Sequence, residues 1–132
     1  MSGQTIVGNA LQFTDDNKHA YANSGVITVA SASSANTIAL KFQTANSYLV
    51  GTLAVQSDEN AGNLLYTTVT FDGTTVFAWK WDLSASSLAT IWPQPLLIPP
   101  NTDVEIKVGA GDTVEFTVQL IAKVGMPQRV GN

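Results

Sequence analysis

Regular alternation of apolar and polar residues is the feature of this chain that most restricts its fold. Along residues 113–124 every second side chain is apolar, and the residues between them are polar apart from Ile121. A period of two is typical of a β-strand that has one buried and one solvated face. The apolar positions on the face expected to be buried are Val114, Phe116, Val118, Leu120, Ala122 and Val124.

Two hairpins are predicted where turn residues separate alternating segments. Asp72-Gly73 is the strongest two-residue hairpin signal in the chain. A second hairpin is expected between residues 103–108 and 113–124, because the Gly-Ala-Gly-Asp of residues 109–112 has the composition of a turn. The strands flanking the first hairpin are residues 63–71 and 74–81.

Four further segments are predicted as strands, and the buried face can be assigned in two of them. Residues 37–43 place Ile38, Leu40 and Phe42 on one face. Residues 46–56 place Leu49, Leu53 and Val55 on one face, with a bulge expected at Gly51. The other two segments are residues 25–30 and, with a weaker pattern, residues 5–13.

About eight strands with turns between them indicate an all-β, two-sheet antiparallel sandwich. We favour a jelly-roll-like arrangement over an immunoglobulin-like one, because the chain has no cysteine for the inter-sheet disulfide. Residues 84–92 are rich in Ser and predict a long connection with room for one helical turn. The expected organisation is a single domain over residues 1–132, with short extended arms at residues 1–4 and 125–132.

Composition excludes several classes of protein. Charged residues make up 12% of the chain, about half the usual fraction, so a fold of solvated helices is not expected. The six basic residues are scattered singly, which argues against nucleic-acid binding. No apolar run is long enough to span a membrane, and the first residues resemble no export signal, so we expect a soluble chain made in the cytoplasm.

Residues suited to catalysis are few. His19 is the only histidine, and a catalytic role would pair it with Asp15 or Asp16 and a serine. We interpret it as a solvated side chain, because the chain has no Gly-x-Ser-x-Gly motif and nothing places a particular serine near it. Asp15-Asp16 and Asp58-Glu59 could offer oxygen atoms to calcium, but neither has the spacing of a calcium loop. We therefore expect a non-enzymatic protein without cofactor or metal, although the sequence leaves open a pair of carboxylates brought together by folding.

Three aromatic residues share one face of a predicted strand, at Phe77, Trp79 and Trp81. An exposed row of this kind would bind sugars or bases by stacking, whereas a buried row would fill the space between the sheets. The opposite face carries Val76, Ala78 and Lys80, which would make a poor core, so the buried arrangement is favoured. Trp92 is equally suited to a partly exposed contact and to anchoring a loop.

Residues 99–102, Pro-Pro-Asn-Thr, predict a sandwich corner, because prolines cannot donate to a strand ladder and Asn101 and Thr102 can bond local backbone groups. The run from Trp92 to Val108, with its apolar stretch, Pro-Pro-x-Thr corner and alternating strand, resembles small jelly-roll structural modules of bacteriophage heads. These modules include minor capsid and cement, or decoration, proteins. The resemblance covers about a third of the chain and carries no catalytic residues with it.

The resemblance implies a viral structural protein that stabilises a phage head lattice. Its expected partners are the major capsid protein and further copies of itself, with a trimer favoured, on the surface of a virion assembled in the host cytoplasm. The predicted contact residues are Trp92, Arg129, Asp58 and Glu59. The alternative is a carbohydrate-binding or receptor-binding module that uses exposed tryptophans.

Overall fold

A computed structural model describes residues 11–13, 18–30, 34–57, 64–82, 91–111 and 113–125. These residues form an all-β structure, and no helix in them is long and apolar enough to cross a membrane. The nine strands are β1 (Gln12–Phe13), β2 (His19–Val29), β3 (Thr37–Gln43), β4 (Tyr48–Ser57), β5 (Leu64–Phe71), β6 (Thr74–Asp82), β7 (Ile91–Ile98), β8 (Asp103–Ala110) and β9 (Val114–Gly125).

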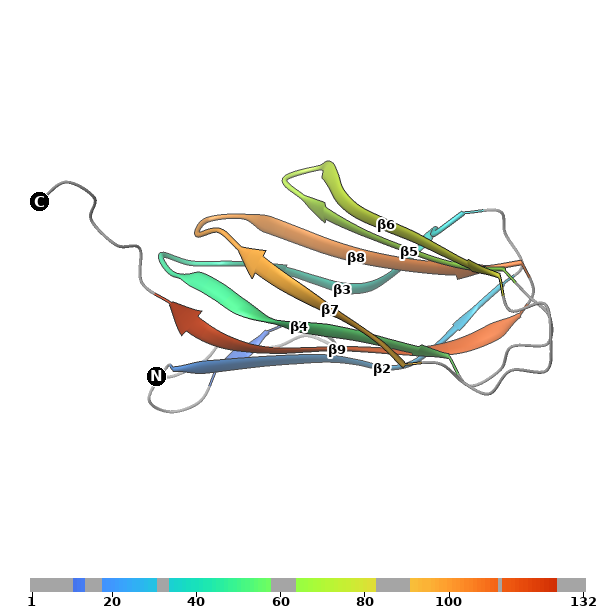
Figure 1. Cartoon of the computed structure of the whole chain (residues 1–132), viewed down its shortest axis with the longest axis horizontal. Coiled ribbons are helices and arrows are strands. Elements are labelled where there is room, and N and C mark those ends of the chain that lie inside the picture. Colours follow the sequence, from blue (N-terminus) through green and yellow to red (C-terminus); the bar gives the residue numbers. More distant parts are fainter. Residues whose placement is uncertain are drawn as a thin grey trace, which may run out of the picture.

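The strands form two antiparallel sheets, with the orders β1-β2-β9-β4-β7 and β3-β8-β5-β6 (Figure 1). The pairing is nested, because β2 pairs with β9, β3 with β8, β4 with β7, and β5 with β6. A long hairpin rolled into two sheets has this topology, which is that of a jelly roll. The predicted fold class is confirmed, with nine strands where about eight were expected.

The Asp72-Gly73 turn lies at the centre of this nested arrangement. Asp72 has φ 51° and Gly73 has φ 84°. Two positive φ angles are the signature of a type I′ turn, whose twist suits a two-residue hairpin. The first predicted hairpin is therefore confirmed, and it is the only connection between consecutive strands from β2 to β9 that stays within one sheet.

The second predicted hairpin is wrong. β8 pairs with β3 and β5, whereas β9 pairs with β2 and β4, so the chain crosses from one sheet to the other between them. Gly109 and Ala110 continue β8 and are buried. A Cβ atom on Gly109 would overlap the carbonyl oxygen of Ser34, so this glycine permits a close backbone approach instead of forming a turn.

The inner faces of both sheets make a single core. Leu49, Leu53 and Val55 are buried, as the alternation predicts. Ile38, however, is 42% exposed, because the pairing of β3 with β8 shifts register between Ile38 and Leu40 and turns Ile38 outward. The other buried apolar residues are Leu11, Ala20, Ala22, Val29, Ala39, Leu40, Phe42, Leu65, Val69, Leu96, Ile98, Val104, Ile106, Val108, Ala110, Val114, Phe116, Val118, Leu120 and Ala122.

Gly51 does not mark a bulge, which corrects the prediction. β4 keeps a continuous register with both β7 and β9 through this position. A Cβ atom on Gly51 would instead overlap the carbonyl oxygen of Ile121 and approach the backbone of Ala122. The glycine allows β4 and β9 to pass close together at the centre of the larger sheet.

A bulge does occur in β2, which is longer than the predicted segment at residues 25–30. Its register with β9 shifts between Asn23 and Val26, and Gly25 has φ 66°. The Asn23 side chain accepts a hydrogen bond from the Gly25 N–H at 2.7 Å, and the Ser24 hydroxyl accepts one from the Val118 N–H at 2.9 Å. Side-chain oxygens thus replace ladder acceptors at the bulge.

β7 is a strand that the sequence analysis missed, since residues 91 and 92 were assigned to the preceding connection. Its two prolines, Pro93 and Pro95, pair opposite Ala54 and Thr52 of β4. β7 is the terminal strand of its sheet, and prolines are tolerated at such an edge because their missing N–H groups can face solvent. Of the predicted strand at residues 5–13, the structure describes only Leu11 and β1.

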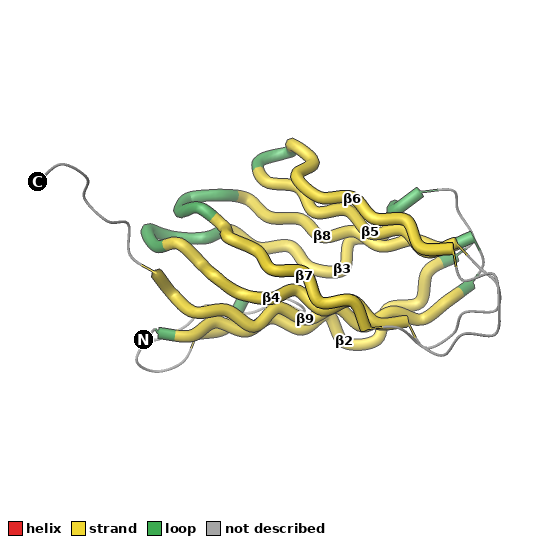
Figure 2. The backbone as a smooth tube through the Cα atoms, in the orientation of Figure 1, coloured by secondary structure: helices red, strands yellow, loops and turns green. Residues whose placement is uncertain are grey.

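The predicted corner at residues 99–102 is confirmed, and it lies beside a second corner between β3 and β4 (Figure 2). The Thr102 hydroxyl donates to the carbonyl oxygen of Pro100 at 3.0 Å, and Asn101 adopts φ 54°. The Thr102 N–H also donates to the hydroxyl of the buried Thr44 at 2.9 Å. Thr44 belongs to the other corner, so the two connections support each other.

Candidate functional site

The outer face of the five-stranded sheet carries large apolar side chains that are open to solvent. Leu97 is 57% exposed, Ile121 55%, Val50 51% and Tyr21 40%. They come from four adjacent strands, β7, β9, β4 and β2. We call these four residues the apolar face.

Strand register brings the four residues together. Tyr21 pairs with Ile121, and Val50 pairs with Leu97. Thr52 lies between Ile121 and the exposed Pro95 in the first row. Neighbouring strands are about 4.8 Å apart and same-face residues on one strand about 6.8 Å apart, so two rows across four strands cover a few hundred Å². Of the eight positions in these two rows, five are apolar, and His19, Lys123 and Thr52 are polar. The largest exposed apolar patch of a soluble protein is often a functional one.

Polar groups lie next to the apolar side chains, and Lys123 of β9 pairs directly with Val50 of β4. His19 and Lys123 pair with each other across β2 and β9 and are both exposed. The Tyr21 hydroxyl donates to Gln119 Oε1 at 3.2 Å and accepts a hydrogen bond from Asn23 Nδ2 at 2.8 Å. Non-obligate protein–protein interfaces combine apolar and polar groups.

The bulge in β2 adds one further apolar residue to this side of the sheet. Val26 follows the bulge and is 69% exposed, the largest value among the exposed large hydrophobic residues. It pairs with Thr117 on the outer face, farther along the strands from the apolar face. A bulge that lifts a side chain out of the sheet is a recurrent feature next to functional surfaces.

Sequence reasoning found only one member of the apolar face. Ile121 stood out as the one apolar residue on the polar side of its strand. Val50 and Leu97 follow buried leucines, so each looked like part of a continuous apolar run. Tyr21 lies in a part of β2 that was not predicted as a strand. The apolar face can be recognised only when the strand register is known, because the register places these residues next to one another.

Of the four predicted contact residues, only Trp92 lies among the residues that the structure describes. Trp92 lies in β7, where its backbone pairs with Val55. Asp58, Glu59 and Arg129 lie outside the described residues. The roles proposed for these four residues therefore stay predictions.

The aromatic row on β6 contributes to the core, as the sequence analysis favoured. Phe77 and Trp79 are half-buried and pack against the core cluster. Their rings stack with centroids 5.9 Å apart and planes inclined by 14°. Val76, Ala78 and Lys80 occupy the opposite, exposed face. The described part of the row is thus an inner surface and not an exposed platform for sugars.

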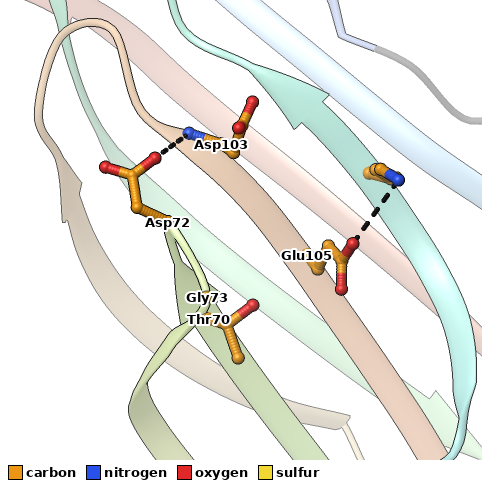
Figure 3. Close-up of a pocket in the computed structure, with 6 residues that line it drawn as sticks. Thr70, Asp72, Gly73, Asp103 and Glu105 are labelled. Carbon is orange, nitrogen blue, oxygen red and sulfur yellow. Dashed lines mark hydrogen bonds and ion pairs between the residues drawn. The ribbon is translucent and has the colours of Figure 1, made fainter.

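A shallow hollow of about 330 Å³ lies on the outer face of the smaller sheet (Figure 3). Glu105 forms ion pairs with Lys41 at 3.5 Å and Lys107 at 3.9 Å, which neutralise part of its acidic lining. Within the ranges that the structure describes, no three His, Cys, Asp or Glu residues are grouped to hold a metal ion. The residues that line the hollow are Lys41, Thr70, Asp72, Gly73, Asp103 and Glu105.

No protein-family model matches the sequence, and no curated protein matches it. Solved structures of infectious bursal disease virus resemble the chain loosely. A structure of the Gt strain has 16% identity and a TM-score of 0.38, and covers 83% of this chain and 35% of its own. A VP2 subviral particle has 15% identity and a TM-score of 0.37, and the match covers 84% of this chain and 35% of the VP2 chain. This chain therefore spans about a third of the length of those chains.

Proposed function

We propose that this chain is a non-enzymatic structural protein of a virus capsid, of the cement or decoration type, which binds a protein lattice through its apolar face. The observation that carries the proposal is the set of four exposed apolar side chains aligned across four strands. Burial of such side chains against a partner contributes about 25 cal/mol for each Å² of apolar surface removed from water.

Two further properties support the proposal. The nested strand pairing is a jelly roll, an architecture found in viral capsid domains and also in lectin domains and cupins. The charged fraction of 12% suits a surface made for contact with protein, because Lys, Glu and Asp are depleted at interface cores. In this proposal the protein works in the virion, on the capsid surface, after synthesis in the host cytoplasm, and its partners are the major capsid protein and further copies of itself.

Co-sedimentation tests the proposal directly. Shells of the virus that encodes this chain would be assembled without it and mixed with the purified protein. We expect the wild-type protein to sediment with the shells and the variant Ile121→Lys to remain in the supernatant. Gln43→Lys is the matched control, because it makes the same exchange to lysine at an exposed position of the smaller sheet. A wild-type protein that does not sediment with the shells would overturn the proposal.

Glycan binding is the alternative function, and it predicts a different result. The described Trp79 faces the core, so this alternative would depend on the side chains of Trp81 and Trp92. Binding of the wild-type protein to a glycan array, combined with unchanged binding by Ile121→Lys, would replace lattice binding by carbohydrate recognition. We expect no glycan to be retained.

A further inference from the structure

The strand β6 forms one edge of the four-stranded sheet. It pairs with β5 along one side, and its other side has no strand partner among the described residues (Figure 1). An edge strand presents backbone N–H and C=O groups that can pair with another chain. Proteins usually protect such edges by making them short or by placing prolines, bulges or charges in them.

The other edges of the two sheets have clearer protection than β6. β1 has two residues, β7 contains Pro93 and Pro95, and β3 is interrupted by the register shift after Ile38. β6 has one irregularity near its start, where Val76 is the additional residue opposite β5. From Phe77 to Asp82 its pairing with β5 is continuous, without a proline. Lys80 is the only positive charge on this stretch.

The inner side of the same edge carries incompletely covered aromatic rings. Phe77 and Trp79 stack on each other and are only half-buried. Close backbone approaches between the two sheets involve β2 and β9 on one side and β3 and β8 on the other, and β6 lies at the opposite end of its sheet from β3. A strand added to β6 would therefore gain backbone hydrogen bonds and also cover these rings.

We propose that β6 pairs antiparallel with β6 of a second copy, about a two-fold axis at Trp79. Residues directly opposite each other in an antiparallel pair point to the same face of the sheet. The two-fold axis must therefore lie where a residue meets the same residue of the second copy, because an axis between two residues would set inner side chains opposite outer ones. An axis at Lys80 would place two ammonium groups opposite each other, and an axis at Ala78 would bring the irregular Val76 into the ladder. The axis at Trp79 pairs residues 77–81 of both copies, which is the regular part of the strand.

A second copy fits this edge because β6 is self-complementary in that register. Trp79 of each copy lies opposite its counterpart, which pairs aromatic rings on the inner face. On the outer face Ala78 lies opposite Lys80, so no like charges face each other directly. A contact in which each copy uses the same surface closes after two subunits, which gives a dimer in place of the trimer favoured from the sequence.

In this dimer both copies could bind a lattice at the same time. A two-fold axis perpendicular to the sheet makes the apolar faces of both copies point in the same direction. When one copy of the dimer is bound to a repeating lattice, the second copy is held close to a neighbouring site. Its high effective concentration there raises the overall affinity of the dimer without any new contact. The pairing of β6 does not depend on the proposed function, since an isolated dimer would form with or without a shell.

Cysteine cross-linking tests the register, because the chain has no native cysteine. Ala78→Cys and Lys80→Cys are both exposed outer-face variants. Directly opposite residues in an antiparallel pair have Cα atoms about 4.5–5.5 Å apart, within the range of a disulfide, whereas diagonal neighbours are about 7–8 Å apart. Random cross-linking of an equimolar mixture gives one half mixed dimer and one quarter of each homodimer. After mild oxidation, intact mass spectrometry should therefore show the mixed dimer in clear excess over that statistical half. A mixture without that excess would overturn the register.

Light scattering across a concentration series tests the dimer itself. We expect wild-type dimers, and at least a tenfold rise in the dissociation constant for Ala78→Lys, which faces Lys80 of the second copy. Ile121→Lys is the control, because it gives the protein the same net charge as Ala78→Lys but lies far from β6. It should leave the dimer intact. Wild-type monomers or trimers would overturn the proposal, as would dissociation by Ile121→Lys alone. Monomeric Ala78→Lys that still sediments with shells would leave the proposed function standing.

Discussion

Asp72 and Asp103 hold each other through two hydrogen bonds. The Asp72 N–H donates to the carbonyl oxygen of Asp103 at 2.8 Å. The Asp103 N–H donates to Asp72 Oδ1 at 2.8 Å, which is the bond drawn between them in Figure 3. The contact joins the β5–β6 hairpin to the first residue of β8. The one tight hairpin of the jelly roll is thereby tied to the neighbouring strand.

Substitution of Asp72 should test its two roles together, as a hydrogen-bond acceptor and as a residue that tolerates a positive φ. Asp72→Ala removes the acceptor and leaves a residue with a Cβ at φ 51°, so the free energy of unfolding should fall by about 1–3 kcal/mol. Asp72→Asn keeps an acceptor oxygen and tolerates the left-handed region, so it should stay close to wild type. Urea denaturation of the three proteins measures the difference. Equal stability of the Ala and Asn variants would contradict this account.

Gly51→Ala should destabilise the fold by steric overlap alone. Its Cβ would meet the carbonyl oxygen of Ile121 and the backbone of Ala122, which cannot move without displacing β9. We expect a loss of about 1–3 kcal/mol or more in thermal or urea unfolding. Gly111→Ala is the control, because its Cβ would approach Leu64 only to 3.8 Å, an ordinary contact. Similar losses in both variants would contradict steric overlap at Gly51 as the cause, because Gly→Ala without overlap should not destabilise.

Ser24→Ala should weaken the bulge in β2. It leaves the part-buried N–H of Val118 without its acceptor, which costs about 1–3 kcal/mol. Ser24→Thr retains the hydroxyl and should lose less. Amide hydrogen exchange at Val118 gives a local measurement, with faster exchange expected in the alanine variant. Unchanged protection at this amide would mean that water or another group replaces the serine.

Thr67→Val should increase stability. The Thr67 side chain is fully buried, and its Oγ1 atom has no hydrogen-bond partner among the described groups. Valine has nearly the same shape and removes the desolvated hydroxyl, so we expect a gain of about 1 kcal/mol in the free energy of unfolding. Thr67→Ser provides the comparison, since it keeps the hydroxyl and loses a methyl group. A destabilised valine variant would indicate that the hydroxyl is bonded in solution.

Local patterns predicted most of the strands and the buried faces of several. Alternation assigned Leu49, Leu53 and Val55 to the core, and Asp72-Gly73 identified the hairpin, because both signals depend on residues within a few positions. The strand β7 was missed because its prolines are acceptable only at a sheet edge, and edge position is a property of the whole sheet. Ile38 was misplaced for a similar reason, since its outward turn depends on the register with β8.

The sequence by itself determined an all-β chain with an amphipathic period of two, a central tight turn and a proline corner. Only the tertiary structure decided which strands are neighbours. The Gly-Ala-Gly-Asp segment shows the difference, since the same residues suit a hairpin turn and a close approach to Ser34. The apolar face likewise exists only because long-range pairing aligns Tyr21, Val50, Leu97 and Ile121. Alternation sets the direction of a side chain, whereas its neighbours across the sheet are set by contacts distant in sequence.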